Sequence, residues 1–335
     1  MRVVIDEYGT YVHKKRNRFV TLNNKDKAIK WEFSADKVSQ ILIYRGAAIT
    51  ADAIDLAVEK GIDIIYLDRF GKPFARTYSC KFENSAAIHR CQVRAYDSEK
   101  GVQLMRGMIE AKVRNQSFLL KSLAKNREDR ELEEVAEHIF SLCAGLPEGG
   151  DIDISRNRLF GIEGEASREY FGALGTVLPE KAYSGKRTKQ PPEDLFNALL
   201  SYGYGILYTE VEKACVLAGL DPYMGFMHTD RPGKPSMVLD LMEEFRQPVV
   251  DRAAISLVSK KVVKPEELKA VENGFYLDRS GRHKMVEAMS SRLSKIITYR
   301  NYQHSFSTLV LRQAREVVKF ICGQEEAYSP FVYGG

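Results

Sequence analysis

Residues 87–125 read AIHRCQVRAYDSEKGVQLMRGMIEAKVRNQSFLLKSLAK, and here apolar side chains begin to recur with the 3.6-residue period of a helix. Upstream, residues 1–80 carry short alternating or β-branched runs that are typical of strands, with one helical pattern at 50–61 (TADAIDLAVEKG). Downstream, we expect no further strands. Strands followed by helices, without alternation between the two, predict an α+β class with segregated parts.

The chain length favours two domains. Its 335 residues exceed the roughly 250–300 at which one hydrophobic core usually stops growing. The change of period places the boundary between a β-strand-rich domain at 1–85 and a larger, all-α domain at 86–335. Turn residues predict breaks between helices near 146–150, 179–192 and 230–235.

Composition excludes a membrane protein. Hydrophobic residues make up 44% of the chain, and no apolar run reaches the roughly 18 residues of a membrane span. The start MRVVIDEYGT has acids at Asp6 and Glu7, where a secretory signal would continue with apolar residues, so we expect a cytoplasmic protein. Five cysteines without a CxxC pair predict free buried thiols.

Basic residues gather in three stretches. Lys plus Arg is 50 against 45 for Asp plus Glu, so the net charge alone argues only weakly for a polyanionic partner. The stretches 13–18, 181–189 and 279–300 are strongly basic, which would suit a phosphate backbone, although solvated surface is the alternative for each. The candidate nucleic-acid contacts within them are Lys186, Arg187, Arg282 and Lys284.

The chain contains no phosphate-binding glycine loop, nucleophile elbow or HExxH zinc motif, which leaves a dispersed set of acids and one histidine. Glu163 stands in an otherwise apolar opening to a helix, and His228 precedes a Pro/Gly loop. The following helix bears Asp240, Glu243 and Glu244, whose spacings of three and four predict one shared face.

One imidazole with two carboxylates suits Mn²⁺, or Mg²⁺ with water completing the octahedron, better than Ca²⁺ or a structural zinc. The alternative is a buried capping histidine beside an acidic surface helix. Spacing alone leaves both interpretations open.

Three segments in this order resemble a known family: GIEGEASREYF at 161–171, NALLSYGYGILYTEVEKACVLAGLDPYMGFMHT at 197–229, and SMVLDLMEEFRQPVVDR at 236–252. They resemble the CRISPR-associated endonuclease and integrase family of spacer acquisition (Cas one, the large subunit of the CRISPR adaptation complex). The segment 49–68 also resembles the β domain of that family. The resemblance implies a β-sandwich-like N-terminal dimerisation domain, an all-α catalytic C-terminal domain and a homodimer.

The resemblance also implies site residues. The catalytic metal ligands of the family fall on Glu163, His228 and Glu243, with Asp240 as the supporting acid. Many members have Asp where this chain has Glu243, and the adjacent Glu244 is the alternative ligand. Asn197 falls on an asparagine of the family, with a simple helix N-cap as the alternative role.

The implied activity is a Mn²⁺- or Mg²⁺-dependent DNA endonuclease and integrase of antiviral defence. A 3′-hydroxyl of a short foreign DNA would attack a phosphodiester of a CRISPR repeat and become a new spacer, and water would give hydrolysis at the same site. The implied partners are DNA (duplex, branched and single-stranded) and a small ferredoxin-like adaptation protein (Cas two). The alternatives are a structure-specific repair nuclease and a non-catalytic DNA-binding scaffold.

Overall fold

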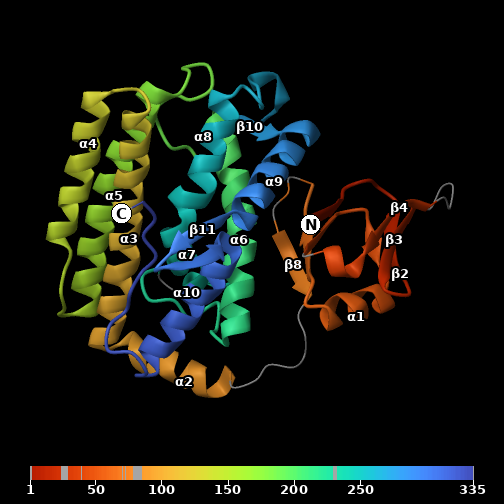
Figure 1. Cartoon of the computed structure of the whole chain (residues 1–335), viewed down its shortest axis with the longest axis horizontal. Helices are drawn as coiled ribbons and strands as arrows, with labels where there is room; N and C mark the ends of the chain where they lie inside the picture. Colours follow the sequence, from red (N-terminus) through yellow and green to blue (C-terminus); the bar gives the residue numbers. More distant parts are fainter. Residues whose placement is uncertain are drawn as a thin grey trace. The chain divides into compact units, whose positions relative to one another are not determined.

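The computed structural model describes residues 2–23, 29–38, 40–69, 71, 73–77, 85–228 and 232–334. The chain divides into two compact units, Met1–Phe82 and Glu83–Gly335. The mixed α+β class, with a β-rich region first and helices afterwards, is confirmed (Figure 1). In these described ranges no helix combines the length and the apolar character that a bilayer crossing requires.

The N-terminal unit contains two sheets. In the first, β1, β5 and β7 run parallel and β8 is antiparallel, in the order β1 (Arg2–Ile5), β5 (Gln40–Tyr44), β7 (Asp63–Leu67) and β8 (Pro73–Thr77). The second sheet has the order β4 (Ile29–Ser34), β3 (Arg18–Asn23), β2 (Thr10–Lys15) and β6 (Ala48–Ile49). The first sheet is therefore partly parallel, a pairing that the alternation of residues did not indicate.

Both sheets contribute to one core. Val3, Ile41 and Ile64 of the first sheet belong to the same buried cluster as Val12 and Phe19 of the second. Helix α1 (Ala51–Glu59) adds its own apolar face to this cluster. The α1 helix lies where its pattern predicted, because Oγ1 of the N-cap Thr50 accepts from the backbone N–H of Ala53 at 3.4 Å and Gly61 adopts a φ of +64°.

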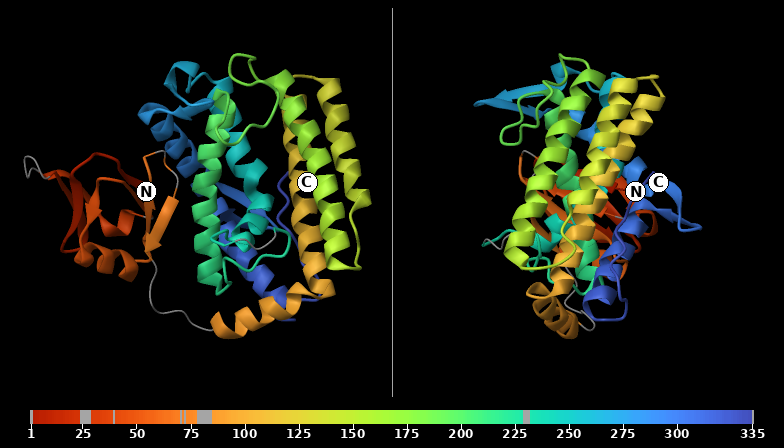
Figure 2. Two further views of the ribbon diagram at one scale, coloured as in Figure 1. Left: turned by 180° about the vertical axis from the view of Figure 1, so that it is seen from behind. Right: turned by 90° about the vertical axis from the view of Figure 1, so that its left-hand side faces the viewer.

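The helical unit begins with α2 (Ser85–Tyr96) and continues through long helices (Figure 2). The helices that follow are α3 (Glu99–Lys125), α4 (Arg130–Ser141), α5 (Ile152–Val177), α6 (Leu195–Ala218), α7 (Ser236–Met242), α8 (Arg252–Ser259), α9 (Arg279–Ser294) and α10 (Phe306–Ile321). Helices α3, α4 and α5 lie side by side, and α6 runs next to α7 and α10 (Figures 1 and 2). The loops predicted at 146–150 and 179–192 are present, whereas 229–231 lie outside the described residues.

Strands do return in the helical unit, which corrects the expectation that none follow residue 85. They form two antiparallel hairpins, β9 (Leu268–Val271) with β10 (Gly274–Leu277) and β11 (Ile296–Tyr299) with β12 (Tyr302–Ser305). Four-residue strands are too short to show a clear period. The turns are the distinctive part of these hairpins. Their residues Asn273, Arg300 and Asn301 have positive φ values of 64°, 48° and 68°.

Helix α5 begins earlier than its sequence pattern indicated. Asp151 caps it, with Oδ1 accepting from the N–H groups of Asp153 and Ile154 at 2.9 and 3.0 Å. Glu163 is therefore in the middle of α5 and not at its opening. The apolar pattern misplaced the start because the first turns of α5 expose polar residues.

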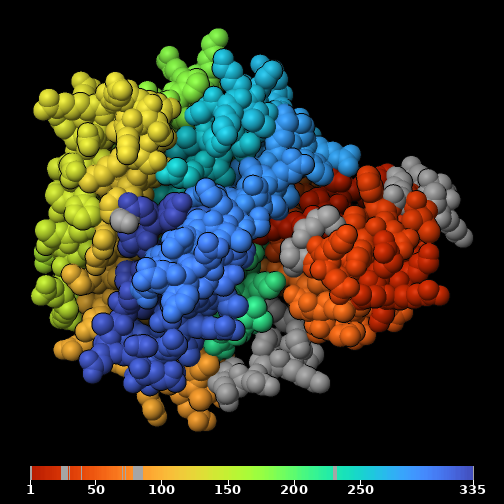
Figure 3. All heavy atoms as spheres, in the orientation of Figure 1, coloured from red at the N-terminus to blue at the C-terminus, as the bar shows by residue number. Residues whose placement is uncertain are grey.

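Residues 328–333 run back onto α3 and lie behind the segment that carries Glu243. The phenyl ring of Phe331 is fully buried and stacks on Phe245, with centroids 4.8 Å apart and an interplanar angle of 9°. Asn115 of α3 donates from Nδ2 to the carbonyl of Phe331 at 3.1 Å and accepts from the N–H of Tyr333 at 2.7 Å. Figure 3 shows these dark-blue residues against the yellow-orange surface of α3.

Of the cysteines in the described ranges, only Cys215 is buried. Cys91, Cys143 and Cys322 are half-buried, which corrects the expectation of buried thiols. Cys80 lies outside the described residues.

Candidate active site

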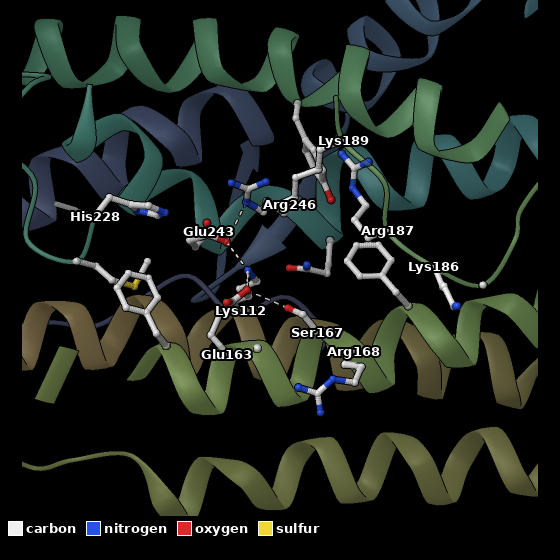
Figure 4. Close-up of a pocket in the computed structure, with 17 residues that line it drawn as sticks. Lys112, Glu163, Ser167, Arg168, Lys186, Arg187, Lys189, His228, Glu243 and Arg246 are labelled. Carbon is white, nitrogen blue, oxygen red and sulfur yellow. Dashed lines mark hydrogen bonds and ion pairs between the residues drawn. The ribbon is translucent and has the colours of Figure 1, made fainter. Parts of the chain in front are cut away.

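A pocket of about 470 Å³ in the helical unit collects the three residues that the sequence singled out. Glu163 comes from α5, His228 from the loop before α7, and Glu243 from the turn after α7 (Figure 4). The other lining residues include the cations Lys112, Arg168, Lys186, Arg187, Lys189 and Arg246. Two carboxylates thus share a pocket with six positively charged side chains.

Lys112 of α3 lies between the two carboxylates. Its ammonium is within 2.8 Å of Oε2 of Glu243 and also donates to Oε1 of Glu163, which accepts from the hydroxyl of Ser167 at 2.9 Å (Figure 4). Arg246 approaches Glu243 from the other side, with Nε 2.8 Å from Oε2. The carboxylates are therefore held together by cations of the protein itself.

These contacts set the charge state of the pocket. Burial favours the neutral form of Glu243, but Arg246 and Lys112 outweigh it and lower its pKa to about 2. Burial likewise opposes charge on Glu163, yet Lys112 keeps the pKa of that carboxyl below its usual value. Burial lowers the pKa of Lys112, but the charges of Glu243 and Glu163 outweigh burial and raise this pKa above its usual value. The site contains two carboxylates and an ammonium at neutral pH.

Asp240 shapes the loop that carries His228. Its buried carboxylate accepts from the backbone N–H groups of Phe226, Met227 and His228 at 2.6, 2.9 and 3.0 Å. The Nδ1 of His228 lies 2.7 Å from Oδ1 of Asp240. Because an ionised carboxylate only accepts hydrogen bonds, Nδ1 carries the proton and Nε2 is left to bind a ligand.

The predicted shared face of Asp240, Glu243 and Glu244 is corrected by the structure. The α-helix ends at Met242, and the chain continues as a 3₁₀ turn at Glu243–Phe245 and a π turn at Arg246–Asp251. This change of winding turns Glu244 away from the pocket: it accepts from the hydroxyl of Tyr328 at 2.5 Å and from the N–H of Phe331 at 2.8 Å. Of the two adjacent glutamates, Glu243 lines the pocket and Glu244 does not.

Asn197 organises the cationic end of the pocket. The N-cap of α6 is Asp194, so Asn197 itself lies in the first turn. Its fully buried side chain accepts from Arg187 Nη1 at 3.0 Å and donates to the carbonyl of Lys186 at 2.8 Å. It thereby holds the backbone of the loop that carries both cations.

The ring of Tyr204 on α6 makes cation–π contacts with two of the arginines. The guanidinium carbons of Arg246 and Arg187 lie 4.7 and 5.6 Å from its ring centroid. Its hydroxyl donates to Oδ1 of the buried Asp251 at 2.6 Å, and Tyr170 donates to Oδ2 at 2.9 Å. Tyr204 and Tyr170 thus hold Asp251, and Tyr204 also packs against Arg246 and Arg187.

Arg282 and Lys284 of α9 do not line the pocket. Arg282 donates from Nη1 to the carbonyl of Leu277 at 3.3 Å, and Lys284 contacts both oxygens of Glu267 at 2.8 and 2.9 Å. Both side chains support the β9–β10 hairpin. Their contact with DNA remains a prediction.

Lys112 and Arg246 are the site residues that the sequence interpretation missed. Lys112 lies 51 positions before Glu163, and a single lysine in a long helix has no local signal. Arg246 had one available signal, since it follows Glu243 by three residues, the spacing of neighbouring side chains on a helix.

Comparison with known proteins decides the family. A sequence profile described as "CRISPR associated protein Cas1" matches residues 3–291. The chain belongs to the Cas1 family. The CRISPR-associated endonuclease Cas1 1 of Archaeoglobus fulgidus is 37% identical, with 99% of each chain covered. CRISPR-associated protein Cas1 3 of Methanobrevibacter ruminantium is 34% identical over 83% of this chain and 84% of its own.

Solved structures share the fold of this Cas1 family member. A casposase bound to integration product superposes with a TM-score of 0.85 at 23% identity, covering 98% of this chain and 93% of that chain. A Cas1 protein from Thermotoga maritima gives a TM-score of 0.80 at 22% identity, covering 98% and 99%. A Cas6-RT-Cas1–Cas2 complex gives 0.78 at 22% identity, covering 99% of this chain and 36% of that chain.

Proposed function

We propose that this chain is a metal-dependent DNA integrase and endonuclease that inserts short foreign DNA into a CRISPR array. The single observation that supports this most is the convergence of Glu163, His228 and Glu243 on one pocket whose other end is cationic. Membership of the Cas1 family, with a relative named as an endonuclease, supports the same conclusion. The fold is also that of a casposase bound to its integration product.

In the proposed reaction, the 3′-hydroxyl of the incoming strand attacks a phosphorus of the repeat. One P–O bond forms and the bond to the target 3′-oxygen breaks, so that one phosphodiester replaces another. The proton lost by the attacking hydroxyl balances the proton gained by the leaving oxygen. When water attacks in its place, the outcome is endonucleolytic cleavage.

A divalent cation is part of this proposal, and the donors present fit Mn²⁺ or Mg²⁺. Glu163 and Glu243 already hold a positive charge between them, and Asp240 leaves Nε2 of His228 available. As the side chains stand, the described residues contain no group of three His, Cys, Asp or Glu that could hold a metal, and the ammonium of Lys112 lies between the two carboxylates. The cation would supply Lewis-acid stabilisation of charge on the attacked phosphate.

The cations of the pocket bind the DNA backbone in this proposal. Lys186, Lys189 and Arg168 are exposed at the pocket, whereas Arg187 is fixed by Asn197 and Tyr204. Such contacts position phosphates without reading bases, so duplex, branched and single-stranded DNA can all enter.

We also propose a homodimer through the β-rich domain at 1–85 and a small ferredoxin-like partner corresponding to Cas2. Each sheet of the N-terminal unit ends on strands whose outer edge is unpaired among the described residues, and pairing between copies would cover them. A structural neighbour is a complex that contains Cas1 and Cas2. Sedimentation of residues 1–85 as a monomer would contradict the dimer, and correctly placed integration by the purified chain alone would contradict the need for the partner.

The decisive experiment compares adjacent glutamates. Glu243→Gln, Glu163→Gln and His228→Ala should each reduce Mn²⁺-dependent strand transfer and cleavage by about 100-fold or more, while duplex affinity changes little. Glu244→Gln is the matched control, since its side chain contacts residues 328–331 and not the pocket. Near-normal activity of His228→Ala would refute the ligand assignment. Cleavage of branched DNA without any joining would favour a repair nuclease.

A further inference from the structure

A second cavity, of about 510 Å³, lies between α8 and α9 and shares no lining residue with the active-site pocket. Four of its lining side chains are cationic and two carry hydroxyls, and no carboxylate is among the described residues that line it. The polar lining residues are Arg252, Ser256, Lys260, Ser291, Arg292 and Lys295. Such a composition excludes a cation site and favours an anion.

One arginine that lines this cavity, Arg292, is held in place by the protein. Arg292 donates from Nε to the carbonyl of Pro248 at 2.6 Å, and its guanidinium carbon lies 4.5 Å from the ring centroid of Phe306. These contacts fix the plane of the guanidinium group. Binding of a ligand therefore costs this side chain little further conformational entropy. A pre-oriented guanidinium is well suited to bind a phosphate group.

Two buried hydrogen-bond donors of the residues that line the cavity have no acceptor in the described part of the protein. Within the described part of the chain, the buried Nη2 of Arg292 and the buried Nε of Arg252 have no hydrogen-bond partner. Because a buried N–H without an acceptor is unfavourable, donors of two neighbouring arginines that the protein leaves unused are suited to an acceptor from outside.

The two arginines also repel each other. Burial lowers the pKa of Arg292, and the charge of Arg252 lowers it further, although Tyr333 opposes the shift. An anion between the two guanidinium groups would remove this repulsion. Lys260 and Lys295 are exposed at the mouth of the cavity, where they extend the positive surface beyond the space that one small anion would fill.

We propose that this cavity binds backbone phosphates of DNA at a site separate from the active-site pocket. The proposal rests on the proposed function in that DNA is the substrate. It assigns the DNA contact of the basic stretch 279–300 to Arg292 and Lys295, because Arg282 and Lys284 support the β9–β10 hairpin. The exposed lysines at the mouth favour a polymer with several phosphates over a single free anion.

The test uses the full chain with Lys260 and Lys295 both changed to Gln, since both side chains are exposed and their loss leaves the fold intact. Duplex affinity is measured by fluorescence anisotropy at a series of salt concentrations. Each lost phosphate contact should reduce the slope of log K against log salt by about 0.9, so we expect a slope shallower by about 1 to 2. The matched control is Lys125→Gln with Arg127→Gln, which removes the same charge from an exposed part of the chain outside both cavities.

A slope that changes equally in both double variants, or in neither, would overturn the proposal. Inorganic phosphate provides the second arm. If it raises the melting temperature of the wild type but not of Arg252→Gln, while the DNA slope stays unchanged, the cavity takes a free anion and the assignment to DNA is wrong. Binding requires no chemistry, so failure of the proposed function would appear separately, as absence of strand transfer by the wild type.

Discussion

Oδ1 of Asp240 lies 2.7 Å from Nδ1 of His228, and the same carboxylate accepts three backbone N–H groups of the loop that ends at His228. One buried side chain therefore fixes both the backbone and the ring of His228. A carboxylate in this position determines which imidazole nitrogen faces the pocket.

Asp240→Asn should reduce strand transfer about 10- to 100-fold and raise the Mn²⁺ concentration needed for half-maximal rate. An amide group cannot accept on both sides, so part of the loop loses its acceptor. The shift in Mn²⁺ dependence separates a positioning role from general destabilisation. Asp278→Asn is the control, because it changes the N-cap of α9, where Asn caps equally well. An unchanged Mn²⁺ dependence in Asp240→Asn would contradict the role.

Lys112→Met should destabilise the metal-free protein by about 3–5 kcal/mol, because it removes the cation of Glu163 and leaves Glu243 with Arg246 alone. In Mn²⁺ the loss should shrink, since a divalent cation can replace the ammonium charge. Chemical unfolding in EDTA and in Mn²⁺ measures both values. The matched control, Lys121→Met on the same helix, breaks a surface pair with Glu137 and should change stability by about 0.2–1 kcal/mol in either buffer. If Lys112→Met lost the same free energy of unfolding in both buffers, the divalent cation would not take the position of the Lys112 ammonium.

Glu244→Gln should change how stability depends on pH. Burial raises the pKa of Glu244 to about 8 in the folded state from 4.5, although Tyr328 and Phe331 oppose the shift. The folded state thus retains a proton that the unfolded chain releases. Its stabilising contribution is fully present below pH 4.5 and is lost as pH rises towards 8. The wild type should therefore lose stability relative to the variant by up to about 1.4 kcal/mol per pH unit in this window. A difference that stays constant in urea titrations from pH 5 to 8 would refute the raised pKa.

Gly225→Ala should impair the site without touching a reacting group. A Cβ at this position would lie 2.6 Å from the backbone carbon of Ser236 and 2.8 Å from Oδ2 of Asp240. The loop that carries His228 would have to shift, so strand transfer should fall at least tenfold, because small displacements of reacting groups are costly. Gly161→Ala on α5 meets open space and should leave activity intact while stabilising the helix by about 0.5–1 kcal/mol. Equal activities of the two variants would count against the contact with Asp240.

The order of elements follows from local sequence, because period and capping are local properties. The Thr50 cap and the Gly61 stop defined α1 from neighbouring residues alone. The sequence placed the start of α5 too late because polar residues in its first turns conceal the helical period. It missed the two hairpins because strands of four residues are too short to show a period of two.

The site was predictable to the extent that its residues lie in recognisable segments. Glu163, His228 and Glu243 meet in one pocket, which the motifs anticipated. What separates Glu243 from Glu244 is the change from α to 3₁₀ winding after Met242, and the partner of Glu244 comes from residues more than eighty positions later. Lys112 is another long-range contribution. Contacts of this kind depend on tertiary packing, which no window of sequence contains.

The packing of Phe331 on Phe245 also constrains the order in which the protein can mature during translation. Glu244 finds its hydrogen-bond partners only after the ribosome has added Tyr328 and Phe331. Until then the buried wall behind Glu243 lacks a ring and two donors, although all pocket residues have already been synthesised. The wall behind Glu243 is therefore completed only when these late residues dock on it, after every residue of the pocket has been made.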